Sequence, residues 1–189
     1  LSAAETSAAI ADKYKWLEYY KLSAKGKWYT AFTDKLVLMT NAEMGYLGFY
    51  NDAVGLSPFE RYFVGGDGIA VFQLDGREVI GLRGYENNRL SPLEGGSIYN
   101  KFQLELRYSI TDAPSASIYT LGFLEAGNSY DNFDTFNPFE LKRSAGVGVR
   151  IFMPAFGLLG IDFAHGFDPL PGFTEKSGWQ THFIIGRQF

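Results

Sequence analysis

The clearest pattern in the sequence is the alternation of apolar and polar residues in Phe102-Gln103-Leu104-Glu105-Leu106-Arg107-Tyr108-Ser109-Ile110. Side chains of a β-strand point alternately to opposite faces, so this period of two predicts a strand with one apolar face and one charged face. The run is longer than the usual strand of a globular protein, which has about five to six residues. Such a strand is typical of a barrel wall between lipid and a wet interior.

Similar alternation continues toward both ends of the chain. In the first segment, Leu22 and Trp28 lie in one phase of the alternation and Lys21 and Lys25 in the other. About seven such segments predict an all-β protein built on an antiparallel sheet. The expected strands cover residues 19–32, 36–50, 102–110, 118–130, 143–153, 158–167 and 181–189.

The connections between these strands alternate in length. Successive connections of an antiparallel sheet lie at opposite ends, so the short turns would gather at one end and the long loops at the other. This asymmetry matches outer-membrane barrels, and the sequence therefore predicts an antiparallel transmembrane β-barrel. The short turns lie near residues 33–35, 111–115 and 153–157, and the long loops cover about 51–97, 128–142 and 168–178.

Composition narrows the possible partners. Of the 189 residues, 17% are aromatic, 22 are glycine and none is cysteine, which suits a β-rich protein without disulfides. The formal net charge of -4 argues against nucleic acid as a partner, because proteins that bind it carry clusters of Lys and Arg. No stretch approaches the roughly 18 apolar residues that a spanning helix needs, so a membrane would be crossed by strands.

Residues for enzymatic or metal chemistry are sparse. The chain has two histidines, His165 and His182, and neither lies in a Ser/His/Asp arrangement, so we expect no enzymatic activity. The loop acids lack the spacing of a calcium-binding loop, and we expect no metal and no cofactor. These acids are Asp67, Asp75, Asp131 and Asp134.

A soluble lipocalin-like barrel or sandwich is the main alternative from the pattern alone, because the same alternation would then point the apolar residues inward. The length of the strands weighs against it. The chain also ends on an aromatic residue, Phe189, at the end of the last expected strand. Both features favour the membrane barrel.

Two motifs in the longest loop, residues 59–68 (Phe-Glu-Arg-Tyr-Phe-Val-Gly-Gly-Asp-Gly) and 80–86 (Ile-Gly-Leu-Arg-Gly-Tyr-Glu), resemble the BamA family. This family is the central barrel subunit of the bacterial outer-membrane protein assembly machinery. The resemblance continues through residues 146–150, 157–163 and 183–189 and covers nearly the whole chain. It implies a barrel of sixteen strands preceded by periplasmic repeat domains. Residues 1–189 would then supply about the last seven strands, without the repeat domains.

The resemblance also implies a lock between the long loop and the barrel wall. In the family the loop folds back into the lumen, and the arginine of its Arg-Gly-aromatic signature, here Arg83-Gly84-Tyr85, contacts acids on the next two strands. The matching acids are Glu105 and Glu125. A guanidinium can hold a carboxylate in two-point geometry, and a glycine lets the backbone pass close. In a wet lumen we expect a partly exposed ion pair that contributes about 1 kcal/mol.

The last strand is the second element that the resemblance marks. It resembles the terminal signal that outer-membrane barrels present to the assembly machinery, and Phe183, Ile185 and Phe189 would face lipid. The lateral seam of the barrel would run beside this strand, including Gly186. An open strand edge is a ready hydrogen-bonding surface for an incoming strand.

The function that the resemblance implies is the assembly and insertion of β-barrel proteins into the outer membrane of a Gram-negative bacterium. The expected partners are unfolded outer-membrane clients, accessory subunits or lipoproteins, outer-membrane lipid and the rest of the same barrel. A two-partner secretion or TamA-like translocation barrel is an alternative within the same superfamily. A small structural or adhesive barrel is a further alternative, although the narrow lumen of eight strands could not admit the long loop.

Overall fold

The computed structural model describes residues 18–51, 54–68, 77–113, 115–154 and 157–186. All regular secondary structure in these ranges is β-strand. The described residues contain no helical membrane span. The strands are β1 (Tyr19–Ala31), β2 (Leu36–Phe49), β3 (Tyr62–Val64), β4 (Glu78–Ile80), β5 (Ile98–Ala113), β6 (Ala116–Tyr130), β7 (Lys142–Met153), β8 (Gly157–Pro169) and β9 (Lys176–Gly186).

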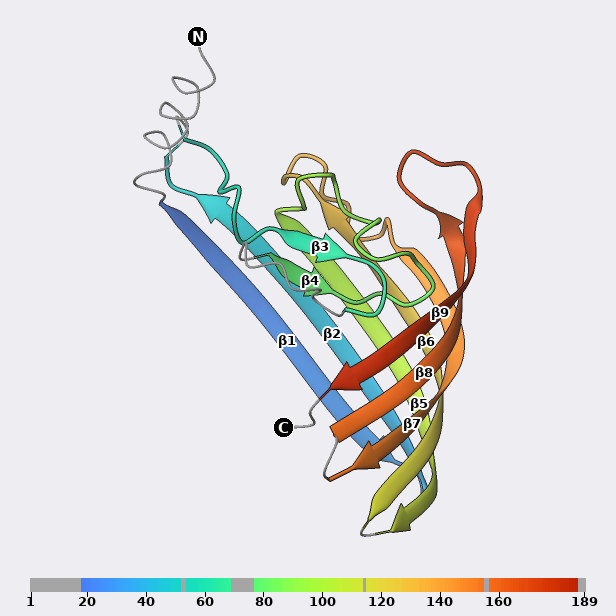
Figure 1. Ribbon diagram of the computed structural model, residues 1–189. Helices are drawn as coiled ribbons and strands as arrows, with labels where there is room; N and C mark the ends of the chain where they lie inside the picture. The colour runs from blue at the N-terminus through green and yellow to red at the C-terminus, as the bar shows by residue number, and fades with distance from the viewer. Residues whose placement is uncertain (1–17, 52–53, 69–76, 114, 155–156, 187–189) are drawn as a thin grey trace, which may run out of the picture.

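Seven long strands form one antiparallel sheet in the order β1-β2-β5-β6-β7-β8-β9, with β1 and β9 at its two edges. The sheet curves strongly, and the long loop between β2 and β5 lies inside the curve (Figure 1). The prediction of an all-β fold with about seven long antiparallel strands is confirmed.

The long loop is partly ordered into strands, which the sequence did not predict. It contains β3 and β4, which pair in parallel with Tyr62 opposite Glu78 and Val64 opposite Ile80. Both Tyr62 and Val64 are fully buried, whereas Phe63 between them is half-buried. The sequence does not reveal these strands, because three residues are too few to show a period of two.

The start of the last strand also differs from the expected position. β9 begins at Lys176 and not at 181, and β8 extends to Pro169. The pairing of β8 with β9 shifts register between Gly166 and Pro169. Such a β-bulge lets a ladder continue through residues that break the alternation. The residues around Gly178, which has a φ of 76°, therefore belong to a strand although they look like a turn.

The two faces of the sheet are as different as the alternation predicts. Along β5, the apolar side chains from Phe102 to Ile110 are 43–55% exposed on the convex face. Glu105, between two of them, is only 3% exposed on the concave face. The concave face is therefore the polar wall against which the long loop packs.

A hydrophobic core joins the loop to this wall. The rings of Tyr62 in β3 and Tyr99 in β5 lie 4.6 Å apart and are both fully buried. Fully burying a large apolar side chain contributes about 1.5–3 kcal/mol, so this cluster is a major reason for the loop to fold inward. Its buried members are Leu47, Tyr62, Val64, Ile80, Leu82, Tyr85, Leu90 and Tyr99.

Candidate functional site

Arg83 lies just after β4 at the point where the loop crosses the concave wall. Its backbone N–H donates to Glu125 Oε2 at 2.7 Å. Its Nε and Nη2 atoms donate to Oε1 of the same carboxylate at 3.0 and 2.7 Å. Glu125, in β6, therefore binds both the main chain and the side chain of Arg83.

Two further acids complete the surroundings of the guanidinium. Nη2 donates to Glu105 Oε2 in β5 at 3.0 Å, and Nη1 donates to Asp162 Oδ2 in β8 at 2.8 Å. The guanidinium carbon lies 3.4 Å from the centre of the Phe123 ring. The structure thus brings Arg83 together with Glu105 and Glu125, and adds Asp162.

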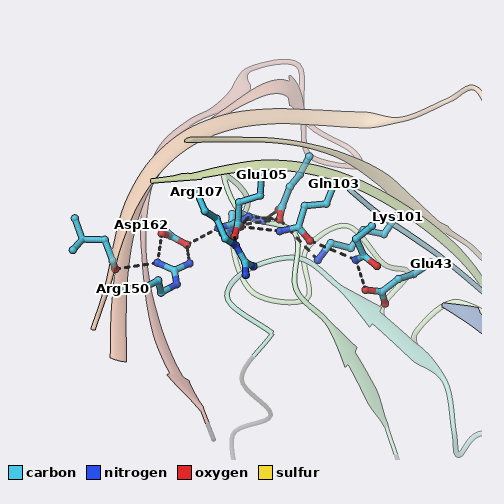
Figure 2. Close-up of polar contacts among 11 residues, drawn as sticks. Glu43, Lys101, Gln103, Glu105, Arg107, Arg150 and Asp162 are labelled. Carbon is cyan, nitrogen blue, oxygen red and sulfur yellow. Dashed lines mark hydrogen bonds and ion pairs between the residues drawn. The ribbon is translucent and has the colours of Figure 1, made fainter. Parts of the chain in front are cut away.

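The acids around Arg83 are themselves held by neighbouring cations. Arg150, in β7, binds Asp162 through two hydrogen bonds of 2.6 and 2.7 Å. Arg107 donates to Glu105 at 2.7 Å, and Lys101 lies 3.9 Å from Glu125. Figure 2 shows this row of polar side chains following β5 toward the Arg150–Asp162 pair.

The glycines of neighbouring strands leave room for this network. A Cβ atom on Gly148 would overlap Asp162 Oδ1. A Cβ on Gly160 would lie 2.5 Å from Arg150 Cδ. Glycines in β7 and β8 therefore provide space for a charged pair that larger residues would exclude.

The network is buried, which corrects the expectation of a partly exposed ion pair. Arg83 is 5% exposed, Glu105 and Glu125 are 3% exposed and Asp162 is fully buried. Burial alone would lower the pKa of Arg83, but the three carboxylates outweigh it and raise the pKa, so the guanidinium stays charged. The expectation was wrong because carboxylates from three strands and the ring of Phe123 enclose the guanidinium.

Gly84 and Tyr85 extend the contact to two more strands. The N–H of Gly84 donates to His182 Nε2 in β9 at 2.9 Å, and its C=O accepts from Ser177 Oγ at 2.8 Å. Tyr85 Oη donates to the C=O of Arg143 in β7 at 2.6 Å. Three consecutive loop residues therefore bind side chains or main chain of β5, β6, β7, β8 and β9.

The sequence of the chain matches the Omp85 superfamily domain across residues 3–189. The chain belongs to the Omp85 superfamily. No characterised protein with curated annotation matches it as a relative. Omp85 proteins are outer-membrane β-barrels that insert or translocate proteins, in Gram-negative bacteria and also in mitochondria and chloroplasts, and they work with other outer-membrane components.

Membership of the Omp85 superfamily agrees with the predicted barrel and assigns the apolar convex face to the membrane side. It confirms the resemblance at the level of the superfamily, not of BamA. Its members are insertion or translocation barrels and not enzymes, which is consistent with the expectation of no enzymatic activity. Among the residues that the structure describes, no group of His, Cys, Asp or Glu could hold a metal ion.

The residues expected to form the terminal signal lie on the opposite face of the wall. Phe183 and Ile185 are 60% and 70% exposed on the convex face of β9. Gly186 pairs with Leu158 of β8 at the end of the strand. Phe189 lies outside the described residues.

Several residues of this site were not predicted as parts of it, among them Asp162 and His182. Asp162 lies between the apolar residues Ile161 and Phe163, so its side chain points to the concave face of β8. A single acid at an alternate position of a predicted strand is a signal that the sequence alone contains. His182 was considered only as a general base. It instead accepts a hydrogen bond from the loop backbone and is 5% exposed.

Proposed function

We propose that the chain is the C-terminal part of the barrel of a BamA-type insertase, which assembles β-barrel proteins into the bacterial outer membrane. The observation that carries this proposal is the attachment of Arg83, Gly84 and Tyr85 to five neighbouring strands. A loop held at that many points keeps these five strands of the barrel wall rigid. Movement would then be concentrated at the edge beside β9.

The edge of β9 would template client strands. β9 pairs with β8 on one side and forms the edge of the described sheet on the other. Its main-chain N–H and C=O groups can form hydrogen bonds with an incoming strand, as in β-strand addition. Phe183 and Ile185 face outward there, so an alternating client strand could place its own apolar residues toward lipid. This role needs no covalent chemistry and no cofactor.

The rest of the machinery is part of the same proposal. The remaining strands would complete a sixteen-stranded barrel, and periplasmic repeat domains before it would receive clients and accessory lipoproteins. Bacterial single-chain barrels have an even number of strands, so a seven-stranded sheet needs further strands to close.

The proposal is tested by crosslinking the full-length protein to a client in proteoliposomes. A photo-crosslinking residue replaces Ile185 on the edge strand, and a matched control replaces Leu124, which is also exposed on the convex face but lies in β6. An unfolded outer-membrane barrel protein is added. We expect client adducts at 185 and not at 124, with appearance of heat-modifiable, inserted client.

Other outcomes would support the alternatives. Protease-protected client inside the vesicles, without insertion, would indicate a two-partner secretion or TamA-like translocation barrel. Neither insertion nor translocation, with no adduct at position 185, would indicate a structural or adhesive barrel and overturn the proposal.

A further inference from the structure

The concave side of β9 makes an unusual contact with the long loop. Both hydrogen-bonding groups of the Gly84 residue, its N–H and its C=O, bind β9 side chains. His182 is 5% exposed, and Ser177 is half-buried. β9 is therefore bound along its length by β8 and across its concave face by the loop.

The geometry assigns a definite role to each side chain. A backbone N–H can only donate, so His182 Nε2 must accept, and the neutral imidazole carries its proton on Nδ1. The hydroxyl of Ser177 donates to the Gly84 C=O. The loop backbone thus finds on β9 both of the polar partners that a buried peptide group needs.

Gly84 is pressed against the wall too closely for any other residue. Its φ is 88°, which favours glycine. An added Cβ would lie 2.8 Å from Ser144 Cβ and 3.0 Å from the backbone N of Gly166. The contact with β9 is therefore made by main chain fixed between β7 and β8.

We propose that His182 and Ser177 are positioning residues that latch the last strand to the long loop through the backbone of Gly84. This proposal rests on the insertase function, because its consequence is that the loop sets how freely β9 moves at the edge where clients would enter. The Arg83 network holds β5, β6 and β8, whereas the latch holds β9. Releasing it frees the edge strand and leaves the rest of the wall in place.

Hydrogen–deuterium exchange of the full-length protein in proteoliposomes tests the latch. His182→Ala and Ser177→Ala are compared with Thr181→Ala, which alters an exposed residue on the opposite face of β9. We expect exchange in residues 176–186 and 82–86 to become about five- to tenfold faster in His182→Ala, since a buried N–H loses its acceptor. Exchange in β5 and β6 should not change, and Thr181→Ala should behave as wild type.

A conservative variant separates the latch from general packing. The Oε1 atom of glutamine can reach the position of Nε2, so His182→Gln should restore slow exchange, whereas the shorter His182→Asn should not. Ser177→Ala keeps the test valid if His182→Ala fails to fold. Unchanged exchange of β9 in both alanine variants, or faster exchange spread over all strands, would overturn the latch.

The insertion assay distinguishes this proposal from the proposed function. Client insertion by the wild-type protein reports on the function, whereas exchange reports on the latch with no client present. Faster exchange in β9 together with an altered insertion rate supports both. Faster exchange in a protein that inserts no client supports a physical latch and refutes the coupling to insertion.

Discussion

The long loop between β2 and β5 is attached to the barrel wall at two places. The ion pairs at these two places have nearly equal lengths but differ in how far their side chains are exposed. At the first, Arg83 binds Glu105, Glu125 and Asp162 at 2.7–3.0 Å, and the side chains are 0–6% exposed. At the second, Lys21 lies 2.9 Å from Glu60 and 3.0 Å from Glu78. There the side chains are 21–36% exposed.

Exposure, and not distance, decides what such a pair contributes to the free energy of unfolding. An exposed pair is screened by water and salt and contributes about 0–1 kcal/mol. A buried pair gains little net energy against its desolvation, but removing one partner leaves an uncompensated charge and costs about 3–5 kcal/mol. Detaching the loop from the wall at the Arg83 site therefore has a large free-energy cost, whereas detaching it at the Lys21 site has a small one.

The largest expected effect comes from breaking the buried site. Arg83→Ala leaves three buried carboxylates without their shared partner and should reduce the free energy of unfolding by about 3–5 kcal/mol. Arg83→Lys should lose less, because an ammonium keeps the charge but not the two-point fork. Urea unfolding and heat-modifiable gel migration of the full-length protein would measure both.

Arg89→Ala is the matched control, because Arg89 lies in the same loop and pairs with Glu86 while about half exposed. It should be close to neutral. The burial of the site predicts that Arg83→Ala loses both stability and client insertion. Wild-type stability in Arg83→Ala would show that the acids find other partners, and the contrast between the two sites would fail.

Two glycines of the loop differ in how closely their backbone approaches the wall. Gly84 and Gly55 both lie in the loop with positive φ, 88° and 76°, but a Cβ on Gly55 would meet nothing within 4 Å. Gly84→Ala should cost about 2–4 kcal/mol, from the left-handed backbone and from overlap with the wall. Gly55→Ala should cost only the backbone part, about 1–2 kcal/mol. Equal losses in urea unfolding would mean that Gly84 is not pressed against the wall.

The sequence predicted the long strands because alternation is a local property that each strand carries by itself. It also placed Glu105 on the charged face, and the resemblance paired Glu105 and Glu125 with Arg83. The partners Asp162 and His182 could not be chosen in this way. Which polar residues of β8 and β9 meet Arg83 and Gly84 depends on how the strands are staggered and how the sheet curves.

The burial of the Arg83 site could not be predicted from the sequence either. Arg83 is enclosed by Glu105, Glu125 and Asp162, which come from β5, β6 and β8, and its guanidinium carbon lies 3.4 Å from the centre of the Phe123 ring. Alternation within one strand does not show that these strands and the loop meet at one point. The short strands β3 and β4 escape prediction for a different reason, because a strand of three residues has too few positions to reveal a period of two.

Two arginine–aspartate pairs in the β7–β8 hairpin allow the comparison to be repeated between the same two strands. Arg150–Asp162 has side chains 6% and 0% exposed, whereas Arg143–Asp168 has side chains 66% and 18% exposed. Asp162→Asn should reduce the free energy of unfolding by about 1–3 kcal/mol, the scale of hydrogen bonds to charged groups. Asp168→Asn should have a much smaller effect. A larger loss in Asp168→Asn, measured by urea unfolding, would reverse the argument from exposure.

The smallest expected effect is at the exposed site, and it should depend on salt and pH. Burial alone would raise the pKa of Glu78, but hydrogen bonds from Lys21 and Lys25 outweigh it and leave the pKa below its ordinary value. The charged form is therefore favoured in the folded protein. Its contribution is complete above the pKa of the unfolded chain and is lost as the pH falls through the lower, folded value.

Glu78→Gln removes that contribution at neutral pH and should cost less than about 1 kcal/mol. At 1 M salt, where the screening length is about 3 Å, wild type and Glu78→Gln should unfold at nearly the same urea concentration. The loss in Arg83→Ala should persist at that salt concentration, because its carboxylates are shielded from ions. If salt instead removed the effect of Arg83→Ala and left that of Glu78→Gln, the loop would be attached most firmly at its exposed site, and the buried network would not be its anchor.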